Sequence, residues 1–449
     1  VALAWRLKNE SFLKDLSWLT NAKLRLGWGL VGNQNAGNYA YGSVMSSVAT
    51  AWGTGFYPGN FSNNKLKWES THSWNAGLDL AFLNNRIEFI FDAYLKNTDN
   101  LLMQAALPAY ISGVISSPWV NTGKMRNKGF EFTLNTVNIT NRDFQWTSGL
   151  TFSLNRNEVL KLYTESTGIQ GKIGNEVFTY TTVGNPVGQF YGYNVIGMFE
   201  KESDFYQKDR NGDIILDANG KPRFVAIPEN KEIAEGTGVW YGDYIYEDVN
   251  GDGVIDEKDR KFIGNPHPDF TIGFNNSITY KGFDFNLFLT ASVGNDGYNY
   301  LLQKQSDPAD RWTTLASVRD YAKLELIDPE GERTFDNMQV ANPGASTYRI
   351  DQSASNQNSR TSNIYVEDAS YLRIKNLSVG YTLPRAFTGR FGVENLRVYC
   401  NIQNLYTFTK YKGYDPEIGA YNQNVLLQGV DYARYPSQRM FTFGLNISL

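Results

Sequence analysis

The sequence predicts an all-β protein whose strands belong to a transmembrane antiparallel β-barrel. Three observations support this fold class: apolar and polar residues alternate along most of the chain, the alternating segments are long, and short connections follow long ones in turn. Phe, Tyr and Trp make up 14% of the 449 residues, and 41 glycines accompany only 14 prolines. This composition is typical of strands and tight turns.

The first strands show the alternation most clearly. Between residues 21 and 30, hydrophobic residues occupy every second position, and basic residues or glycines fill most of the positions between them. Successive side chains of a strand point to opposite faces, so this pattern gives one apolar face. Residues 74–82 and 87–95 repeat it on either side of Asn84 and Asn85. We therefore expect a long hairpin with a two-residue Asn-Asn turn.

Further segments alternate in the same way and bring the total to about a dozen strands. They are residues 130–139, 144–154, 270–280, 283–293, 372–384, 395–406 and 439–449. Many reach the length of about 9 to 11 residues that a tilted membrane-crossing strand needs, whereas strands of soluble proteins average about 5 to 6. Strand length therefore favours a membrane barrel over a soluble sandwich.

The connections support the same environment. Short turns at 84–85, 139–143 and 281–282 alternate with long irregular segments, and outer-membrane barrels have short periplasmic turns and long extracellular loops. The predicted extracellular loops cover residues 33–67, 103–118, 161–185, 200–268, 297–364 and 411–434. Six tryptophans fall at or near strand ends, as an interfacial aromatic girdle requires: Trp5, Trp18, Trp28, Trp68, Trp74 and Trp146.

The alternation also assigns faces. We expect an outward, lipid-facing set comprising Leu78, Leu80, Phe89, Phe91, Phe132, Phe152, Leu287, Leu377, Val379, Phe443 and Leu445. We expect a lumen-facing set comprising Asp79, Glu88, Asp92, Glu131 and Asp284, because charge on the lipid face is costly.

Composition excludes several classes of protein. Forty-two Lys and Arg balance 46 Asp and Glu, with both signs spread along the chain, so we expect no nucleic-acid partner. Cys400 is the single cysteine, which excludes an internal disulfide framework. No signal peptide opens the chain and Val1 lies inside a predicted strand. We therefore expect the C-terminal part of a longer precursor.

Residues 246–260 carry oxygen-bearing side chains at a spacing close to that of an EF-hand calcium loop. The candidate ligands are Asp248, Asn250, Asp252, the Val254 carbonyl, Asp256 and Asp259. Gly253 would allow the sharp turn, but the last ligand is the shorter Asp rather than Glu and no long helical pattern flanks the loop. A structural calcium site and an ordinary solvated turn are the two alternatives. A second run at 208–217 lacks the turn glycine and predicts a plain loop.

Catalytic motifs are missing from the sequence. It has no G-x-S-x-G, no H-E-x-x-H and no Cys-His pair that would suit nucleophilic or zinc chemistry. Carboxylates such as Glu88 and Asp92 are spaced as lumen-facing strand residues rather than as a glycosidase pair. We therefore expect a protein that is not an enzyme and requires no cofactor beyond the calcium considered above.

Seven segments in order resemble the SusC/RagA-type TonB-dependent transporters of the Bacteroidetes outer membrane. They begin with "AWRLKNESFLKDLSWLTNAKLRLGWGLVGNQ", "KWESTHSWNAGLDLAFLNNRIEFIFDAYLKNTDNLL", "NTGKMRNKGFEF" and "VGNPVGQFYGYNVIGMF". They continue with "GDYIYEDVNGDGVIDEKDRKFIGNPHPDFTIGFNNSITYKGFDF", "VEDASYLRIKNLSVGYTLP" and "NLYTFTKYKGYDPEI". The resemblance covers most of the chain.

The resemblance implies a multi-pass β-barrel of the cell outer membrane that imports oligomeric nutrients. It implies that this chain is the C-terminal part of a 22-stranded barrel, with the plug and TonB box outside it. A SusD-like surface lipoprotein would close over the barrel, and TonB would pull on the plug, because the outer membrane has no ATP. Glycan and peptide importers share these motifs, so both substrate classes stay open.

Aromatic and polar residues gather in two of the predicted loops, where they would bind the substrate or the lipoprotein. They are Tyr298, Tyr300, Arg311, Trp312, Tyr414, Asp415, Tyr421 and Tyr432. The same residues would also serve a surface β-protein that binds glycan without moving it, such as an adhesin. An adhesin would purify from water, whereas a transporter needs detergent.

The order of the turns predicts orientation. If the last strand runs inward, then residues 297–364 and the Asp248 to Asp259 loop are extracellular, and the turns at 281–282 and 384–392 are periplasmic. The 297–364 loop and the Asn84-Asn85 turn should then lie at opposite ends of the sheet.

Overall fold

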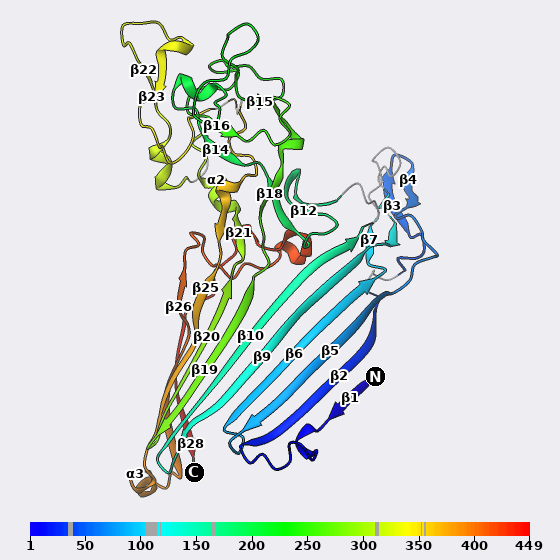
Figure 1. Cartoon of the computed structure of the whole chain (residues 1–449), viewed down its shortest axis with the longest axis vertical. Coiled ribbons are helices and arrows are strands. Elements are labelled where there is room, and N and C mark those ends of the chain that lie inside the picture. The colour runs from blue at the N-terminus through cyan, green and yellow to red at the C-terminus, as the bar shows by residue number, and fades with distance from the viewer. Residues whose placement is uncertain are drawn as a thin grey trace.

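The fold is built around one large curved sheet. The computed structural model describes residues 1–34, 39–104, 115–116, 118–162, 168–309, 314–351, 353 and 356–449. Eleven antiparallel strands pair in chain order, with β1 and β28 at the two edges (Figure 1). The strands are β1 (Ala2–Trp5), β2 (Leu19–Asn33), β5 (Glu69–Phe82), β6 (Ile87–Asp99), β9 (Lys124–Thr140), β10 (Phe144–Lys161), β19 (Phe270–Tyr280), β20 (Phe283–Val293), β25 (Tyr371–Thr382), β26 (Asn395–Thr409) and β28 (Met440–Ser448).

The lengths of these strands match the sequence-based expectation. Apart from the 4-residue β1, they run from 9 residues in β28 to 18 in β10. Strands of this length suffice to cross the apolar part of a bilayer when tilted. Within the described residues, no helix is both long and apolar enough to span a membrane.

Short turns and long connections lie at opposite ends of the sheet (Figure 1). The turns that join β5 to β6, β9 to β10, β19 to β20 and β25 to β26 lie at one end, and the long connections lie at the other. The predicted separation of the 297–364 loop from the Asn84-Asn85 turn is confirmed. Which end faces the cell exterior stays a prediction.

One predicted turn is longer than expected. Phe82 and Ile87 form the last pair of the β5–β6 hairpin, so the turn has four residues rather than two. Leu83, Asn84 and Asn85 take positive φ angles of 52°, 57° and 62°. The asparagines tolerate this left-handed conformation well, and Leu83 N–H donates to the Trp18 carbonyl at 2.9 Å, which holds the turn against the neighbouring segment.

The register places the two predicted side-chain sets on opposite faces. Residues directly opposite each other in a sheet share a face. The pairs Leu78 with Phe91, Phe91 with Phe132 and Phe132 with Phe152 carry an apolar face across four strands. The pairing of Asp92 with Glu131 and of Asp284 with Gly380 keeps the carboxylates on the other face.

Tryptophans mark two levels on the apolar face. Trp18 stacks on Phe82 beside the short-turn end, with ring centroids 5.8 Å apart. Trp28 and Trp74 pair directly across β2 and β5, with centroids 6.0 Å apart. Nine residues separate Leu19 from Trp28, about 30 Å along the strand. With a tilt of about 35–45° this spacing matches an apolar band about 25 Å tall.

Three of the long connections form a compact body at the far end of the sheet, here called the head: the described residues of 162–269, 294–370 and 410–439. Small strands organise it (Figure 1): β11 (Ile169–Ile173), β12 (Glu176–Thr181), β13 (Gln189–Gly192), β14 (Val195–Met198), β15 (Ile227–Pro228), β16 (Tyr244–Tyr246), β17 (Val254–Ile255), β18 (Lys261–Gly264), β21 (Asp296–Asn299), β22 (Leu324–Leu326), β23 (Met338–Val340), β24 (Val366–Asp368) and β27 (Val430–Asp431).

The remaining elements are short. Near the β2 edge lie β3 (Met45–Thr50), β4 (Gly53–Pro58), β7 (Leu102–Gln104) and β8 (Trp119–Asn121). The helical turns are η1 (Leu7–Asn9), η2 (Glu202–Phe205), η3 (Glu257–Asp259), α2 (Tyr300–Gln305), η4 (Ala316–Asp320), η5 (Phe335–Asn337), η6 (Asn363–Tyr365), α3 (Arg385–Thr388), η7 (Gly389–Phe391), η8 (Tyr421–Gln423) and η9 (Val425–Leu427).

The connection between β10 and β19 is single and unbroken. We expected two loops, 161–185 and 200–268. Instead β10 pairs directly with β19, and the intervening strands β13 and β14 belong to small sheets of the head. Their four residues each are too few to cross a membrane.

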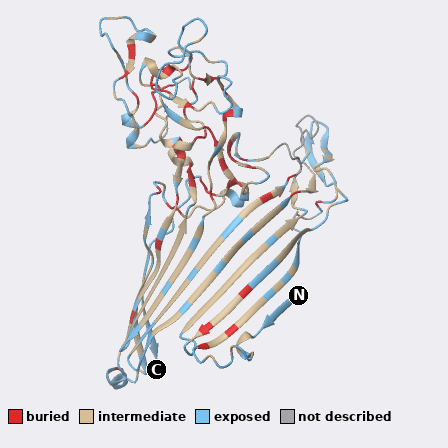
Figure 2. Ribbon diagram, in the orientation of Figure 1, coloured by how far each residue is buried: buried red, intermediate tan, exposed pale blue. Residues whose placement is uncertain are grey.

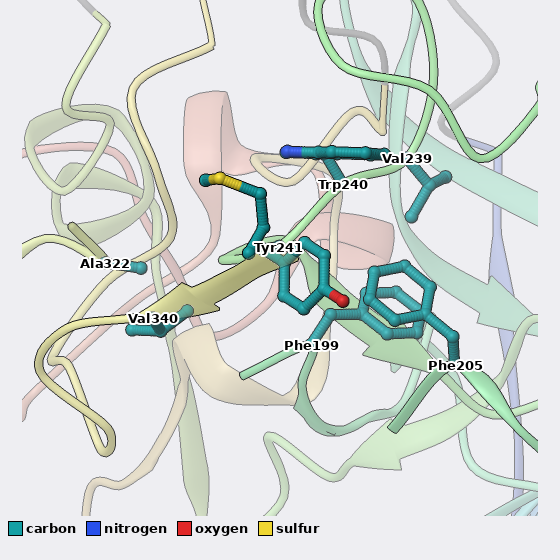
Figure 3. Packing of buried hydrophobic residues seen from close by; sticks show 8 residues of the cluster. Phe199, Phe205, Val239, Trp240, Tyr241, Ala322 and Val340 are labelled. Atoms are coloured by element: carbon teal, nitrogen blue, oxygen red, sulfur yellow. The ribbon is translucent and has the colours of Figure 1, made fainter. Parts of the chain in front are cut away.

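The head has its own hydrophobic core. Figure 2 shows buried residues concentrated in the head and its base, while most of the sheet is only partly buried. Phe199 and Phe205 stack with centroids 4.2 Å apart, and Tyr241 packs edge-on against Phe205 (Figure 3). Ala322 and Val340 belong to the same cluster and come from the connection that joins β20 to β25. Two connections far apart in sequence therefore fold together as one body.

Candidate functional site

Three connections meet at the base of the head. Strand β21 pairs antiparallel with β24 and parallel with β27. Tyr298 of β21 and Val430 of β27 belong to a second core cluster, together with Phe178, Phe190, Tyr365 and Leu427. Of the candidate residues, Tyr298 belongs to this cluster, and Tyr300 and Tyr421 pack against it.

Three of the predicted tyrosines form a stacked cluster, here called the tyrosine stack. Tyr300 of α2 lies parallel to Tyr432, with ring centroids 4.5 Å apart and planes 15° apart. Tyr421 of η8 contacts Tyr432 at 4.9 Å. Burial, together with the nearby Tyr432 and Glu176, raises the pKa of Tyr300, so its hydroxyl stays protonated. Tyr432 remains 41% exposed, which leaves ring surface for a ligand.

Tyr298, only two residues before Tyr300, has a different role. It is completely buried, and its hydroxyl donates to Gln303 Oε1 at 2.9 Å. Its ring packs edge-on against Phe178 at 5.1 Å. We expected a residue that contacts a substrate or partner, but Tyr298 lies in the core, because β21 is the central strand between β24 and β27 and three of its four residues are buried. Tyr298 is therefore part of the core cluster against which Tyr300 packs.

Asp415 is buried in an ion pair with Arg373 of β25. Arg373 Nη1 also lies 2.7 Å from Glu417 Oε2. Burial opposes ionisation, but the backbone N–H groups of Ser437 and Glu417, together with Arg373, outweigh it and hold the pKa of Asp415 at about 2. Asp415 therefore anchors the 411–434 segment to the large sheet instead of contacting a ligand.

Tyr414, the neighbouring residue, is 63% exposed and lines a cavity of about 640 Å³. The cavity lies against α2 and the backbone around Thr347. Among the predicted residues that the structure describes, Tyr414 is thus the most exposed. Arg311 and Trp312, also predicted here, lie outside the described residues.

The Asp248 to Asp259 loop is held by its own backbone. Asp248 accepts from the N–H groups of Gly251 and Gly253 at 2.7 and 2.9 Å. Asp259 is completely buried and accepts from Val249 N–H at 2.9 Å and from Asp256 N–H at 2.7 Å. These are the contacts of a tight turn with Asp side chains capping it.

In the present arrangement of this loop, protein donors already engage several of the candidate ligands. Both oxygens of Asp259 are taken by backbone donors, and Lys258 Nζ lies 3.0 Å from Asp256 and 3.8 Å from Asp252, where a cation would compete with it. The backbone N–H and then the ammonium of Lys258 lower the pKa of Asp256. Among the described residues no three acidic, His or Cys side chains converge as a metal site. Calcium binding stays a prediction of the sequence alone.

Sequence reasoning missed several residues that shape the base of the head. Arg373 looked like an ordinary polar strand position, yet only 2% of it is exposed. Phe178 and Phe190 fell in stretches of weak alternation. Arg260 and Arg360 lie 100 residues apart, and both stack over the ring of Tyr193. No local pattern singles out these arginines, and none in the sequence joins segments so far apart.

Comparisons with known proteins agree with this architecture. The family model of the TonB-dependent receptor-like β-barrel matches residues 1–405. TonB-dependent receptor P3 of Formosa agariphila is 36% identical over 99% of this chain and 41% of its own length. TonB-dependent receptor SusC of Bacteroides thetaiotaomicron is 30% identical over all of this chain and 39% of its own length. The chain therefore spans about two fifths of the length of these relatives.

A solved structure shares the fold. The structure of the RagAB peptide transporter superposes with a TM-score of 0.73 over 99% of this chain and 43% of that chain, at 22% identity. Long tilted strands, an apolar face with two tryptophan levels and short turns opposite a head define an outer-membrane β-barrel protein. The chain belongs to the TonB-dependent receptor β-barrel family, and the SusC/RagA-type resemblance is confirmed.

Proposed function

We propose that the protein of which this chain is part imports an oligomeric nutrient across the outer membrane with energy delivered through TonB. The observation that carries this proposal is the head: three long connections at one end of a family-typical barrel sheet share a core and present a stacked tyrosine cluster. Family membership supports the coupling to TonB.

The head suits capture of an oligomer at the mouth of the barrel. A wide lumen cannot by itself hold a sparse ligand tightly, so affinity has to come from groups that converge at the entrance. The tyrosine stack offers ring faces, and the buried Arg373–Asp415 pair holds the segment carrying Tyr421 in place. Glycan and peptide both remain candidates as substrate class, because the name of SusC specifies neither and RagAB is described as a peptide transporter.

We propose further that a SusD-like surface lipoprotein docks on the head, which we place on the extracellular side. Exposed apolar residues of the head support this docking: Tyr414, Val425 and Tyr432 are 63%, 68% and 41% exposed in the 410–439 connection. An apolar surface of this kind is unfavourable in water unless a partner covers it. Affinity purification of the full-length protein in mild detergent, followed by identification of co-purifying lipoproteins, tests the proposal.

Uptake of labelled oligomer by cells tests transport itself. Cells expressing the full-length protein should accumulate the label internally, and cells that lack TonB should bind it only at the surface. Surface binding that is unchanged by loss of TonB, with no internal label in either strain, would instead favour the alternative of a glycan-binding surface protein that moves nothing.

A further inference from the structure

A basic cavity of about 300 Å³ lies beside the tyrosine stack. Five separate segments line it: the β11–β12 turn, Tyr193, the residue that follows η3, helix α2 and the 357–361 stretch. Strand β12 and helix α2 both lie between the large sheet and the upper part of the head (Figure 1). The cavity is therefore at the base of the head, where an incoming oligomer would first enter the barrel.

Two arginines are stacked over one tyrosine in this cavity. The guanidinium carbons of Arg260 and Arg360 lie 5.3 and 4.6 Å from the ring centroid of Tyr193, which is itself buried. Arg360 also lies 4.7 Å from the centroid of Tyr246. Stacking of this kind fixes a guanidinium plane while its N–H groups stay available in the plane.

The partners of these arginines leave their charge largely uncompensated. Arg360 donates from Nε to the Gln357 carbonyl at 3.2 Å and from Nη2 to the Asn356 carbonyl at 2.9 Å, both uncharged acceptors. Arg260 lies 3.6 Å from Glu257, whose side chain is 85% exposed. A pair this open to water is weak. The cavity thus holds two cations with little internal neutralisation.

Glu176, the acidic residue of the cavity, is already engaged. Its Oε1 accepts from Gln303 Nε2 at 2.5 Å and from Thr361 Oγ1 at 3.0 Å. Its Oε2 lies 3.7 Å from Lys304 Nζ. Three cations, Arg260, Arg360 and Lys304, therefore face one carboxylate, and the net positive charge suits an anionic group.

Lys304 connects the cavity to the tyrosine stack. Its ammonium lies 5.1 Å from the ring centroid of Tyr300 and lines the basic cavity from the same helix. A ligand that places an anionic group near Lys304 would therefore have a ring surface within reach. Aromatic faces suit the apolar face of a pyranose ring, and an extended peptide has no comparable need for them.

We propose that this cavity binds the acidic group of an oligosaccharide, a sugar carboxylate or a sulfate ester, while the tyrosine stack receives an adjoining sugar ring. This inference depends on the proposed function in one respect, because it takes the ligand to be the oligomer that the protein imports. Arg260 and Arg360 supply planar donors for two oxygens, and Lys304 supplies charge between the cavity and the stack.

Equilibrium binding to the full-length protein in detergent tests this proposal without any transport step. The probes are an oligogalacturonate, its methyl ester, a sulfated galactan oligosaccharide, a neutral malto-oligosaccharide and a glutamate-rich peptide. We expect one or both acidic oligosaccharides to bind more tightly than the neutral probes, and whichever binds identifies the anionic group as carboxylate or sulfate. Raising the salt concentration should weaken that binding.

Arg360→Gln and Lys304→Gln should each weaken binding of the acidic oligosaccharide roughly 10- to 100-fold, the loss expected for one hydrogen bond to a charged group. Arg360→Lys should recover only part of the affinity, since it keeps the charge but loses the planar donors. Arg333→Gln is the matched control, because Arg333 belongs to the head but pairs with Glu235 away from the cavity. Lys304 is 46% exposed, so its substitution leaves folding intact even if that of Arg360 does not.

Equal binding of acidic and neutral oligosaccharides, binding of the peptide alone, or equal loss in Arg333→Gln would overturn the proposal. So would failure of both acidic oligosaccharides to bind. Failure of TonB-dependent uptake in cells that still bind the acidic probe would reject the proposed function and leave this site standing.

Discussion

Arg25 on β2 donates a hydrogen bond of 2.9 Å to Asp92 on β6, although β5 lies between the two strands. The guanidinium can cross because the residue directly between them is Gly77, which pairs with both. A second arginine reaches a carboxylate across a glycine in the same way, near the other edge of the sheet. Arg397 on β26 reaches Asp284 on β20 at 2.8 Å, and Gly380 of β25 lies between.

These crossings make Gly77 sensitive to the smallest side chain. A Cβ at this position would lie 2.5 Å from Asp92 Oδ1 and 2.6 Å from Arg25 Cζ. Gly77→Ala should push the two side chains apart and lower the free energy of unfolding by about 0.5 to 1.5 kcal/mol, the usual net contribution of one hydrogen bond. The loss of heat-modifiable mobility on gels, followed against temperature, measures it.

Gly29→Ala is the control for that prediction. Gly29 lies in the adjacent strand β2, and nothing lies within 4 Å of a Cβ built there. Its effect should stay within about 0.5 kcal/mol, as for an ordinary surface change. Equal midpoints for the two alanine variants would show that the Arg25–Asp92 contact does not depend on the gap at Gly77.

The Asp415–Arg373 pair should make the stability of the head depend on acid pH. Because the fold holds the pKa of Asp415 at about 2, below its ordinary value of 3.8, its stabilisation is complete above about pH 4 and is lost as the pH falls through 2. The shift corresponds to about 2 kcal/mol. Asp415→Asn should be destabilised by about that amount at neutral pH.

The difference between native protein and Asp415→Asn isolates this group from other carboxylates. Their thermal midpoints should converge as the pH approaches 2, since protonation of Asp415 removes the same charge that the substitution removes. A constant gap between the two midpoints from pH 6 to pH 2 would contradict the role given to this carboxylate.

The tyrosine stack should contribute to ligand binding more than to folding. Tyr432→Ala removes the central ring, and loss of one aromatic stacking contact should weaken oligosaccharide binding roughly 5-fold, about 1 kcal/mol. Tyr435→Ala is the matched control, because Tyr435 is 77% exposed and lies only three residues further along the chain. Titration followed by intrinsic fluorescence compares the two, and equal affinity in both variants would remove the stack from the binding site.

The Asp248 to Asp259 loop should be indifferent to calcium. In its present arrangement backbone N–H groups satisfy Asp248 and Asp259, and Lys258 neutralises Asp256. Chelation with EDTA should therefore leave the thermal midpoint unchanged. A rise in midpoint on addition of calcium, abolished in Asp248→Asn, would show that the loop rearranges to hold the ion as its spacing suggests.

The large sheet was predictable because its signal is local. Alternation alone located residues 283–293 and the turn at Lys281 and Gly282, where φ angles of 44° and 89° match a two-residue hairpin turn. It also assigned Asp92 and Phe91 to opposite faces. Each of these statements needs only the pattern within one strand or one hairpin.

The head was not predictable in the same way, since its contacts join segments far apart in sequence. Tyr298 and Tyr300 carry the same side chain two positions apart, yet one is in the core and the other in an open stack. The chain changes from strand β21 to helix α2 between these two residues, and no strong sequence pattern predicts that change. Arg260 and Arg360 both contact the ring of Tyr193, and no periodicity in the sequence indicates these contacts.

Import by this protein is tested most directly by TonB-dependent uptake of an intact labelled oligosaccharide into cells that express the full-length protein. We expect internal label in these cells, retention of surface label alone when TonB is absent, and reduced uptake for Tyr432→Ala but not for Tyr435→Ala. Internal label that is independent of TonB, or surface binding with no internal label in any strain, would contradict that expectation.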